Sequence, residues 1–170
     1  MLSQKRKGII LAGGKGSRLW PITLGVSKQL LPLYNKPAIY YPLSTLMISN
    51  IREFLIITNQ QDINNFKALL GDGSHLGISI TYKIQKRPEG IAQALIIGEK
   101  FIHNSPVALI LGDNFFYGHD LTNVLLKEAK KTNVATIFAS EVRDPEHYGV
   151  VSFDKNLNVK SIFEKPKKPK

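Results

Sequence analysis

One short loop has residue types that suit the binding of phosphate. Residues 11–21, LAGGKGSRLWP, follow an apolar run and contain three glycines, a lysine and an arginine. Glycines let the backbone approach an anion and direct successive N–H groups at it, and the guanidinium of Arg18 can pair with two phosphate oxygens at once. From Gly14 the loop reads G-x-G-x-x-L, and no Lys-Ser or Lys-Thr pair follows at the Walker spacing, so neither common phosphate motif is matched. We predict a phosphate-binding loop of another type; a tight turn with a surface arginine is the alternative.

A carboxylate and a second cation are candidates for the same site. Asp113 ends the apolar run VALILGDN (107–114), where a carboxylate is rare unless a cation pairs with it. Because Mg²⁺ is bound by one or two carboxylates together with phosphate oxygens, Asp113 indicates a magnesium–nucleotide site; a strand-ending cap is the alternative. Lys28, in GVSKQLLP, is either a second cation for the polyphosphate or a surface lysine.

Several other chemistries lack the residues that they need. The chain has no cysteine, which excludes disulfides, zinc–thiolate sites and thiol catalysis. The four histidines show no paired metal-ligand spacing, and no serine, histidine and acid stand in a hydrolase context. A dehydrogenase is disfavoured, because the third glycine of the dinucleotide motif is absent and Glu53 is not placed as a ribose-binding acid.

Short apolar runs alternate with longer amphipathic segments along the chain. Continuous apolar runs, typical of strands buried on both faces, lie at 7–13, 53–59, 107–114 and 134–142. An alternating run at 78–85 predicts a further strand, and helical patterns lie at 40–50, 61–71, 89–103 and 119–131. Pro42 is compatible with the first of these helices only in its first turn. This β-α-β-α order predicts an α/β sandwich with a mostly parallel sheet and right-handed crossovers.

The predicted topology brings the candidate residues to one edge of the sheet. Ligands of open α/β sheets bind at the carboxyl ends of the strands, near the point where the strand order reverses. Loops that leave strand ends carry residues 13–18, Gln85, Asp113 and the pair Glu164 and Lys165. After Val142 two short strands, in YGVVSFD and VKSIFEKP, flank a turn and predict a mixed-sheet extension.

Composition describes an ordinary globular protein with excess positive charge. The chain has 170 residues, 43% of them hydrophobic and 21% charged, which predicts a single domain with a real core. Much of the net charge of +10 lies near the two ends, and no basic stripe is interleaved with aromatics, so we expect no nucleic-acid partner. The first apolar run is too short for a secretory signal and no segment reaches the length of a membrane span, so we expect no membrane partner and a cytoplasmic location.

Together the motifs resemble a known family. GIILAGGKGSRLWPITLGVSKQLLPLYNKPAIYYPLS, LLGDGSHLGISITYKIQKRPEGIAQA, LILGDNFFYG, DPEHYGVV and FEKPKKPK resemble the sugar-phosphate nucleotidyltransferases, from about Lys7 to the last residue. The loop GG-x-G-[ST]-R-L marks the family, and SKQLLP, YYPL and EGIAQA are similar to its thymidylyl branch. The resemblance implies a Rossmann-like three-layer α/β fold of nucleotidyltransferase type. It also implies Mg²⁺-dependent transfer from dTTP to glucose 1-phosphate, giving dTDP-glucose and pyrophosphate.

Roles carry over from the family position by position. Arg18 and Lys28 would be catalytic, and Asp113 would bind Mg²⁺. The nucleotide would be bound by Gly13, Gly14, Gly16, Ser17, Gln29, Gln85 and Gly90. Among these, Gln29 would flank the reacting groups and the deoxyribose, while Gln85 and the Gly90 backbone would read the thymine edge. The sugar phosphate would be bound by Tyr148, Gly149, Glu164 and Lys165.

The main departure from the family is length. Its members continue further, adding a second metal-ligating aspartate and part of the subunit contacts, so the resemblance implies a C-terminally truncated fold and a homo-oligomer in the full-length form. We expect one domain over 1–170, with a nucleotide-binding part at about 7–145 and the start of a sugar-binding part at about 146–165. A UTP-using uridylyltransferase and a nucleotide-binding remnant with little activity stay open. So does the pathway that takes the product, whether to rhamnose or to another deoxysugar.

Overall fold

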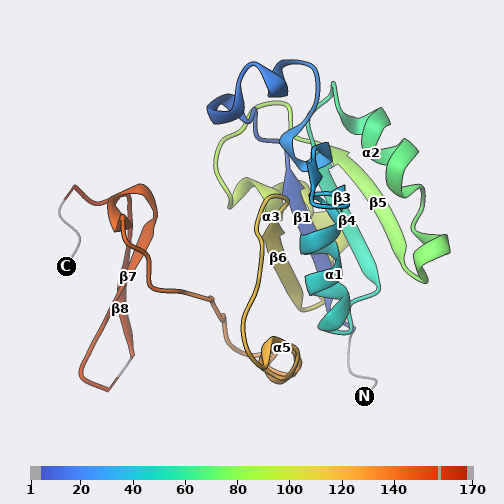
Figure 1. Ribbon diagram of the computed structural model, residues 1–170. Helices are drawn as coiled ribbons and strands as arrows, with labels where there is room; N and C mark the ends of the chain where they lie inside the picture. The colour runs from blue at the N-terminus through green and yellow to red at the C-terminus, as the bar shows by residue number, and fades with distance from the viewer. Residues whose placement is uncertain (1–4, 157, 168–170) are drawn as a thin grey trace. The chain divides into compact units, whose positions relative to one another are not determined.

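A computed structural model describes residues 5–156 and 158–167, in two compact units, Met1–Asn133 and Val134–Lys170 (Figure 1). The strands of the first unit are β1 (Lys7–Ala12), β2 (Pro32–Leu33), β3 (Lys36–Pro37), β4 (Glu53–Thr58), β5 (Ser79–Ile84) and β6 (Val107–Leu111). Its helices are α1 (Tyr40–Ile48), α2 (Ile63–Leu70), α3 (Gln93–Ile97), α4 (Glu99–Ile102) and α5 (Leu121–Ala129). The second unit contains β7 (Gly149–Phe153) and β8 (Val159–Glu164). No helix in the described ranges is long and apolar enough to cross a membrane.

A parallel four-stranded sheet organises the first unit. Its strand order is β5-β4-β1-β6, and β1 pairs in parallel with β4 on one side and with β6 on the other. The apolar runs form strands because both faces of the sheet are covered, so successive residues such as Ile9 and Ile10 are both fully buried. The prediction of a mostly parallel α/β sheet is therefore confirmed.

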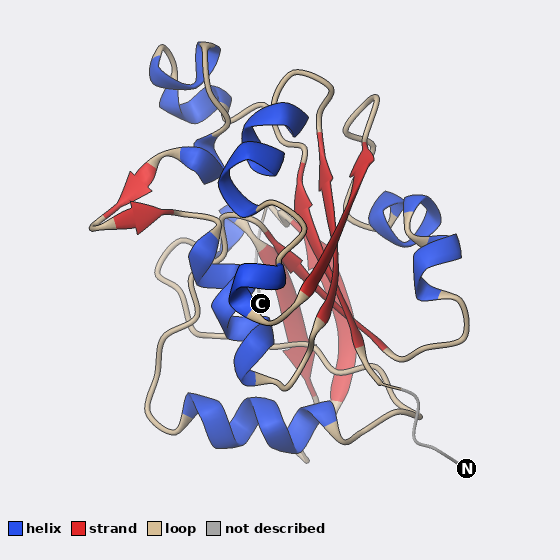
Figure 2. Cartoon of the chain, turned by 90° about the vertical axis from the view of Figure 1, so that its right-hand side faces the viewer, coloured by secondary structure: helices blue, strands red, loops and turns tan. Residues whose placement is uncertain are grey.

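Helices α1 and α2 cover one face of this sheet. Leu43 of α1 and Phe66 of α2 pack in one buried cluster with Ile10, Phe54 and Ile56 of the sheet. Pro42 lies in the first turn of α1, as predicted, where its missing N–H costs no helical hydrogen bond. Helices lie on both sides of the sheet in Figure 2, which gives the molecule's first unit three layers.

The opposite face is covered by α3 and α4, which the sequence predicts as one helix over 89–103. That prediction is wrong at its start and at its middle, because α3 begins at Gln93 and ends before Gly98. A Cβ on Gly98 would lie 2.9 Å from Cδ1 of Ile9 and 3.2 Å from Cδ2 of Leu55. The glycine thus allows close contact with the sheet at the point where the helix is interrupted.

Two arginines donate hydrogen bonds to backbone carbonyls near the amino-terminal ends of the sheet strands. The guanidinium of Arg6 donates to the carbonyls of Val107, at 2.9 Å, and of Ala129 and Lys131, and so joins the end of α5 to β6. Arg52 donates to the carbonyls of Met47 and Ile51. Both arginines line a cavity of about 420 Å³, where they satisfy carbonyl groups of the chain itself.

The second unit is a β-hairpin preceded by an extended segment. β7 and β8 pair antiparallel, and the turn between them is held by Asp154, whose carboxylate accepts from the N–H groups of Asn156 and Asn158. These two strands confirm the prediction, but the strand predicted over 134–142 is wrong, because residues 131–144 contain no helix or strand and are exposed. An apolar run becomes a strand only beside a partner strand, and within the described residues β6 pairs with β1 alone.

Candidate functional site

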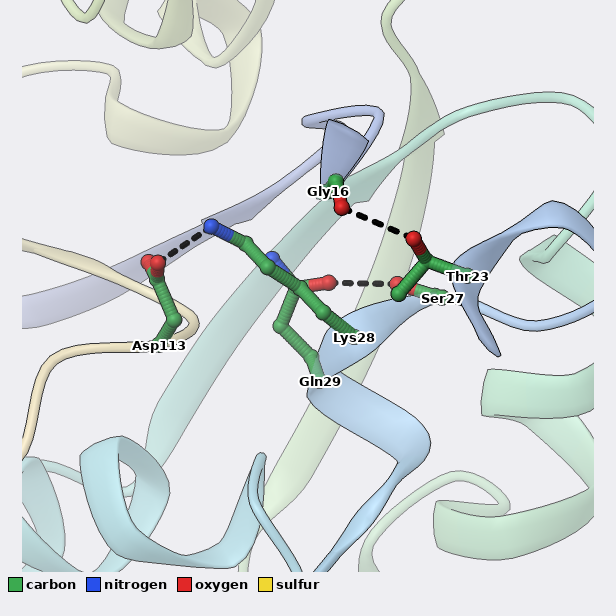
Figure 3. A network of polar contacts seen from close by, with 6 residues as sticks. All are labelled: Gly16, Thr23, Ser27, Lys28, Gln29 and Asp113. Atoms are coloured by element: carbon green, nitrogen blue, oxygen red, sulfur yellow. Dashed lines mark hydrogen bonds and ion pairs between the residues drawn. The ribbon is translucent and has the colours of Figure 1, made fainter. Parts of the chain in front are cut away.

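Lys28 and Asp113 meet at the carboxyl edge of the sheet. Asp113 follows β6, Lys28 begins a short 3-10 helix after the glycine loop, and the Lys28 Nζ donates to Oδ2 of Asp113 in an ion pair (Figure 3). The two side chains are 26% and 40% exposed, so both charges remain accessible to a ligand. The sequence predicted that these residues lie close together, and the structure brings them together.

The glycine loop folds back on itself beside this pair. Gly16 has a φ of 62°, in the left-handed region that glycine adopts without strain. Its carbonyl accepts from Oγ1 of Thr23 at 2.7 Å (Figure 3). The same carbonyl accepts from the N–H of Leu19 at 2.9 Å. Ser17 and Arg18 then lie exposed on a single 3-10 turn. Within the described chain the Arg18 guanidinium has no hydrogen bond or ion pair, so it is available to an anionic ligand.

The backbone next to Lys28 is held by a buried polar network. Ser27 donates its hydroxyl to Oε1 of Gln29 and its N–H to Oδ1 of Asp62, at 3.2 Å. Asn59 donates to the other carboxylate oxygen of Asp62, at 2.5 Å, and Asp62 is only 8% exposed. Sequence reasoning missed Asp62 and Asn59, although a carboxylate in the loop between β4 and α2 was a visible signal. The network fixes the segment that presents Lys28.

Gln29 itself is almost completely buried. It is 1% exposed, its backbone carbonyl accepts from Ile39 at 2.8 Å, and its side chain packs against Gly112, where a Cβ would lie 2.9 Å from Cγ. The predicted contact of Gln29 with the nucleotide stays a prediction. In this structure its side-chain amide accepts from the Ser27 hydroxyl and so stabilises the loop that carries Lys28.

Gln85, the predicted base-reading residue, lies at the end of β5 and is 4% exposed. Its Nε2 donates to Oε1 of Gln93 at 2.5 Å, and its Oε1 lies so near the Gly13 backbone that a Cβ there would overlap it. Gly13 is therefore needed for the packing of Gln85, a reason separate from phosphate binding. Gly90 has a φ of 99° and is exposed in the same connection between β5 and α3.

Gly14 occupies the open part of the glycine loop. It is exposed, and a Cβ added there would meet no atom within 4 Å. Space therefore does not require glycine at this position, and its predicted contact with phosphate stays a prediction.

The predicted sugar-phosphate residues gather at one end of the β7–β8 hairpin. Gly149 is the register partner of Glu164, and the N–H of Lys165 donates to the carbonyl of Tyr148 at 2.9 Å. The Nζ of Lys165 lies 3.6 Å from Oε1 of Glu164, and both side chains are exposed. The hairpin thus brings these four residues together within the second unit.

The donor set at Asp113 can be compared with the needs of Mg²⁺. No group of three or more histidine, cysteine, aspartate or glutamate side chains that could hold a metal ion is found among the described residues. A lone, partly exposed carboxylate suits a cation that takes its other ligands from water and phosphate, which is the usual binding mode of Mg²⁺ at nucleotides. Asp113 therefore fits magnesium carried by a triphosphate and does not fit a metal enclosed by protein ligands.

The chain is similar to known proteins over almost its whole length. The family model described as nucleotidyl transferase matches residues 7–170. A glucose-1-phosphate thymidylyltransferase from Neisseria meningitidis is 59% identical over 164 residues, which cover 96% of this chain and 57% of that protein. The chain thus spans little more than half the length of this curated relative.

Solved structures agree with the sequence matches. A structure from Bacillus anthracis, described provisionally as a glucose-1-phosphate thymidylyltransferase, superposes with a TM-score of 0.89 at 39% sequence identity. The superposition covers 96% of this chain and 66% of the B. anthracis chain. A UDP-glucose pyrophosphorylase bound to UDP-glucose superposes with a TM-score of 0.78 at 27% identity, covering 95% and 69%.

Proposed function

Because this chain belongs to the nucleotidyl transferase family, we propose that it carries the site that transfers a thymidylyl group from dTTP to glucose 1-phosphate, giving dTDP-glucose and pyrophosphate. The observation that carries the proposal is the Lys28–Asp113 pair at the carboxyl edge of the sheet, next to the glycine loop, where Gly16 lies close to Cβ of Lys28. The names of the curated relatives support the choice of substrates.

The reaction needs charge and alignment rather than a general base. A phosphate oxygen of glucose 1-phosphate attacks the α-phosphorus of dTTP in line, the new P–O bond forms, and pyrophosphate leaves with the electron pair of the broken bond. The second pKa of a phosphate monoester is about 6, so the nucleophile is already ionised at neutral pH. Such a mechanism needs no histidine–acid pair.

Arg18, Lys28 and Asp113 have different roles in binding the phosphates. Arg18 and the N–H groups of the glycine loop bind the β- and γ-phosphates and stabilise the charge that develops on the leaving group. Lys28 exchanges the carboxylate of Asp113 for phosphate oxygens, while Asp113 is the residue that would hold Mg²⁺. The metal, when bound, supplies further neutralisation of charge at the reacting phosphates.

Recognition of the two organic groups lies with other residues. The Gln85 amide and the Gly90 backbone read the pyrimidine edge, and on the hairpin Glu164 accepts from glucose hydroxyls while Lys165 pairs with the sugar phosphate. We further propose a cytoplasmic enzyme that acts on small molecules without nucleic acid and forms homo-oligomers in its full-length form.

A uridylyltransferase is the second candidate, favoured by the 27% identical pyrophosphorylase structure with UDP-glucose. The third is a nucleotide-binding remnant with little activity, since the chain spans 57% of the length of its N. meningitidis relative.

Release of pyrophosphate by the 170-residue chain distinguishes the thymidylyltransferase, the uridylyltransferase and the nucleotide-binding remnant. The chain is supplied with glucose 1-phosphate, Mg²⁺ and either dTTP or UTP, beside a full-length relative. We expect slower turnover than in the relative, with dTTP preferred. Faster release from UTP supports the uridylyltransferase, and dTTP binding by calorimetry without turnover supports the remnant.

A further inference from the structure

Gln93 joins the predicted base-reading residue to the loop that follows β5. Its Oε1 accepts from Nε2 of Gln85 at 2.5 Å and from the N–H of Glu89 at 3.2 Å. Its Nε2 donates to Oε2 of Glu89 at 2.8 Å. Gln93 is the first residue of α3 and is partly buried, so the helix determines where its amide lies.

The directions of the hydrogen bonds among Glu89, Gln93 and Gln85 are set by the two groups of Glu89, because neither of them can act as both donor and acceptor. A backbone N–H only donates and an ionised carboxylate only accepts. Glu89 offers one of each, so Gln93 must turn Oε1 to the N–H and Nε2 to the carboxylate. With an acceptor facing it, Gln85 must then offer its Nε2. A flipped Gln85 would place its oxygen against the oxygen of Gln93 and lose this hydrogen bond.

After this contact Gln85 retains one Nε2 hydrogen and its Oε1. Within the described chain, Oε1 of Gln85 has no hydrogen-bond partner, whereas every fully buried side-chain nitrogen or oxygen has one. Oε1 is therefore not fully buried, and it reaches the surface beside Gly13. One acceptor next to one donor is complementary to an imide edge, in which N3–H donates and O4 accepts. Cytosine presents the reverse pattern, with N3 accepting and its amino group donating.

We propose that Gln93 is a positioning residue that holds the Gln85 amide in the orientation that accepts thymine or uracil and rejects cytosine. The proposal rests on the proposed function, in which Gln85 reads the base. Discrimination then comes from the pair of glutamines together with Glu89, because Gln85 alone could rotate its amide and pair with either edge.

The test measures the ratio of dTTP to dCTP affinity by calorimetry on the 170-residue chain. Gln93→Met removes both polar groups at similar volume. We expect weaker dTTP binding and a dTTP-to-dCTP ratio that falls about tenfold, the scale of a base contact made by two hydrogen bonds. Gln61→Met, at an exposed glutamine in another connection, is the matched control and should leave the ratio unchanged.

A polarity exchange separates positioning from simple packing. In the double variant Gln93→Glu with Glu89→Gln, residue 93 still accepts from Gln85 and from the N–H of residue 89, while residue 89 now donates to residue 93. This variant should keep most of the discrimination, and it tests the proposal even where Gln93→Met does not fold. A ratio unchanged in Gln93→Met, or lost in the folded double variant, overturns the proposal.

Gln85→Ala distinguishes this failure from that of the proposed function. If Gln85→Ala leaves dTTP affinity unchanged, Gln85 does not read the base, and the role of Gln93 is refuted with it, while the proposed function itself is still decided by the release of pyrophosphate. If Gln85→Ala weakens dTTP binding but Gln93→Met keeps the ratio, only the role of Gln93 is refuted.

Discussion

Arg18 is exposed on the 3-10 turn that follows the glycine loop, and within the described residues it has no hydrogen-bond or ion-pair partner. Negative charge grows on the leaving pyrophosphate, so Arg18 should stabilise the transition state more than the ground state. In any catalytically competent form of the protein, we expect Arg18→Ala to lower kcat by about 10²-fold or more, with a smaller change in KM. Steady-state kinetics measure both constants.

The control for Arg18 is Lys100→Ala, which removes a charge from an exposed position on α4. It should leave kcat unchanged. A raised KM with normal kcat in Arg18→Ala would show that the arginine contributes to binding only.

Tyr82 makes the fold sensitive to alkaline pH. Burial, and secondarily the charge of Asp72, raise the pKa of its phenol to about 12, and the hydroxyl donates to the carbonyl of Gly71 at 2.7 Å. Because the folded pKa exceeds that of the unfolded chain, this stabilisation is complete below about pH 10 and is lost as pH rises towards 12.

Tyr82→Phe should therefore reduce the free energy of unfolding by about 1 kcal/mol at neutral pH, the value of one hydrogen bond. The loss should shrink between about pH 10 and 12, because Phe has no proton to release. Urea denaturation across that range measures the effect. Tyr117→Phe, at a residue that is 91% exposed, is the control, and equal pH dependence in both variants would contradict the assignment.

The placement of candidate residues was predictable where chemistry and sequence position coincide. Lys28, Asp113 and Arg18 were visible because each charged side chain follows a glycine loop or an apolar strand. Gln93 and Asp62 were not, since a glutamine at the start of a helix and an aspartate before one have many structural uses. Their roles depend on which side chains the sheet brings beside them.

Arg6 joins two elements that are far apart in the chain. Its guanidinium donates to carbonyls of Val107, Ala129 and Lys131, at the start of β6 and the end of α5. Hydrogen bonds from a charged donor contribute about 1.5–3 kcal/mol, so Arg6→Ala should lower the free energy of unfolding by about 2 kcal/mol. Urea denaturation measures it.

Two further variants define what Arg6 supplies. Lys5→Ala, at the exposed neighbour that lines the same cavity, should have little effect. Arg6→Lys keeps the charge without the planar fork and should recover only part of the loss. Full recovery would mean that charge alone matters at this position.

Element boundaries show what the sequence pattern can and cannot predict. The sheet strands β1, β4 and β6 were predictable because burial on both faces requires continuous apolar runs, and β5 was predictable from its alternating pattern. The helix predicted over 89–103 was wrong because it begins only at Gln93 and divides at Gly98, where the chain lies close to Ile9 and Leu55, a contact that exists only in the folded chain. The β2–β3 hairpin was missed because its strands have two residues each.

At the scale of the whole molecule, the predicted three-layer α/β fold of nucleotidyltransferase type is confirmed by the superposition on the B. anthracis structure, with a TM-score of 0.89. The predicted division near residue 145 stays a prediction. The strand predicted over 134–142 depends on a neighbouring strand, and no local pattern can supply that partner. Composition likewise indicates a globular protein but leaves open which pyrimidine it binds.

The position of β1 in the sheet has a consequence for the order of folding. β1 is central in the sheet, and both of its partners, β4 on one side and β6 on the other, follow it in the chain. The backbone groups of β1 are fully paired only after both distant segments have been synthesised, so its pairing contacts are non-local. Topologies of this kind fold slowly. A nascent chain therefore exposes the apolar strand β1 before its partners are synthesised, and chaperones that bind extended apolar segments would meet β1 before its sheet exists.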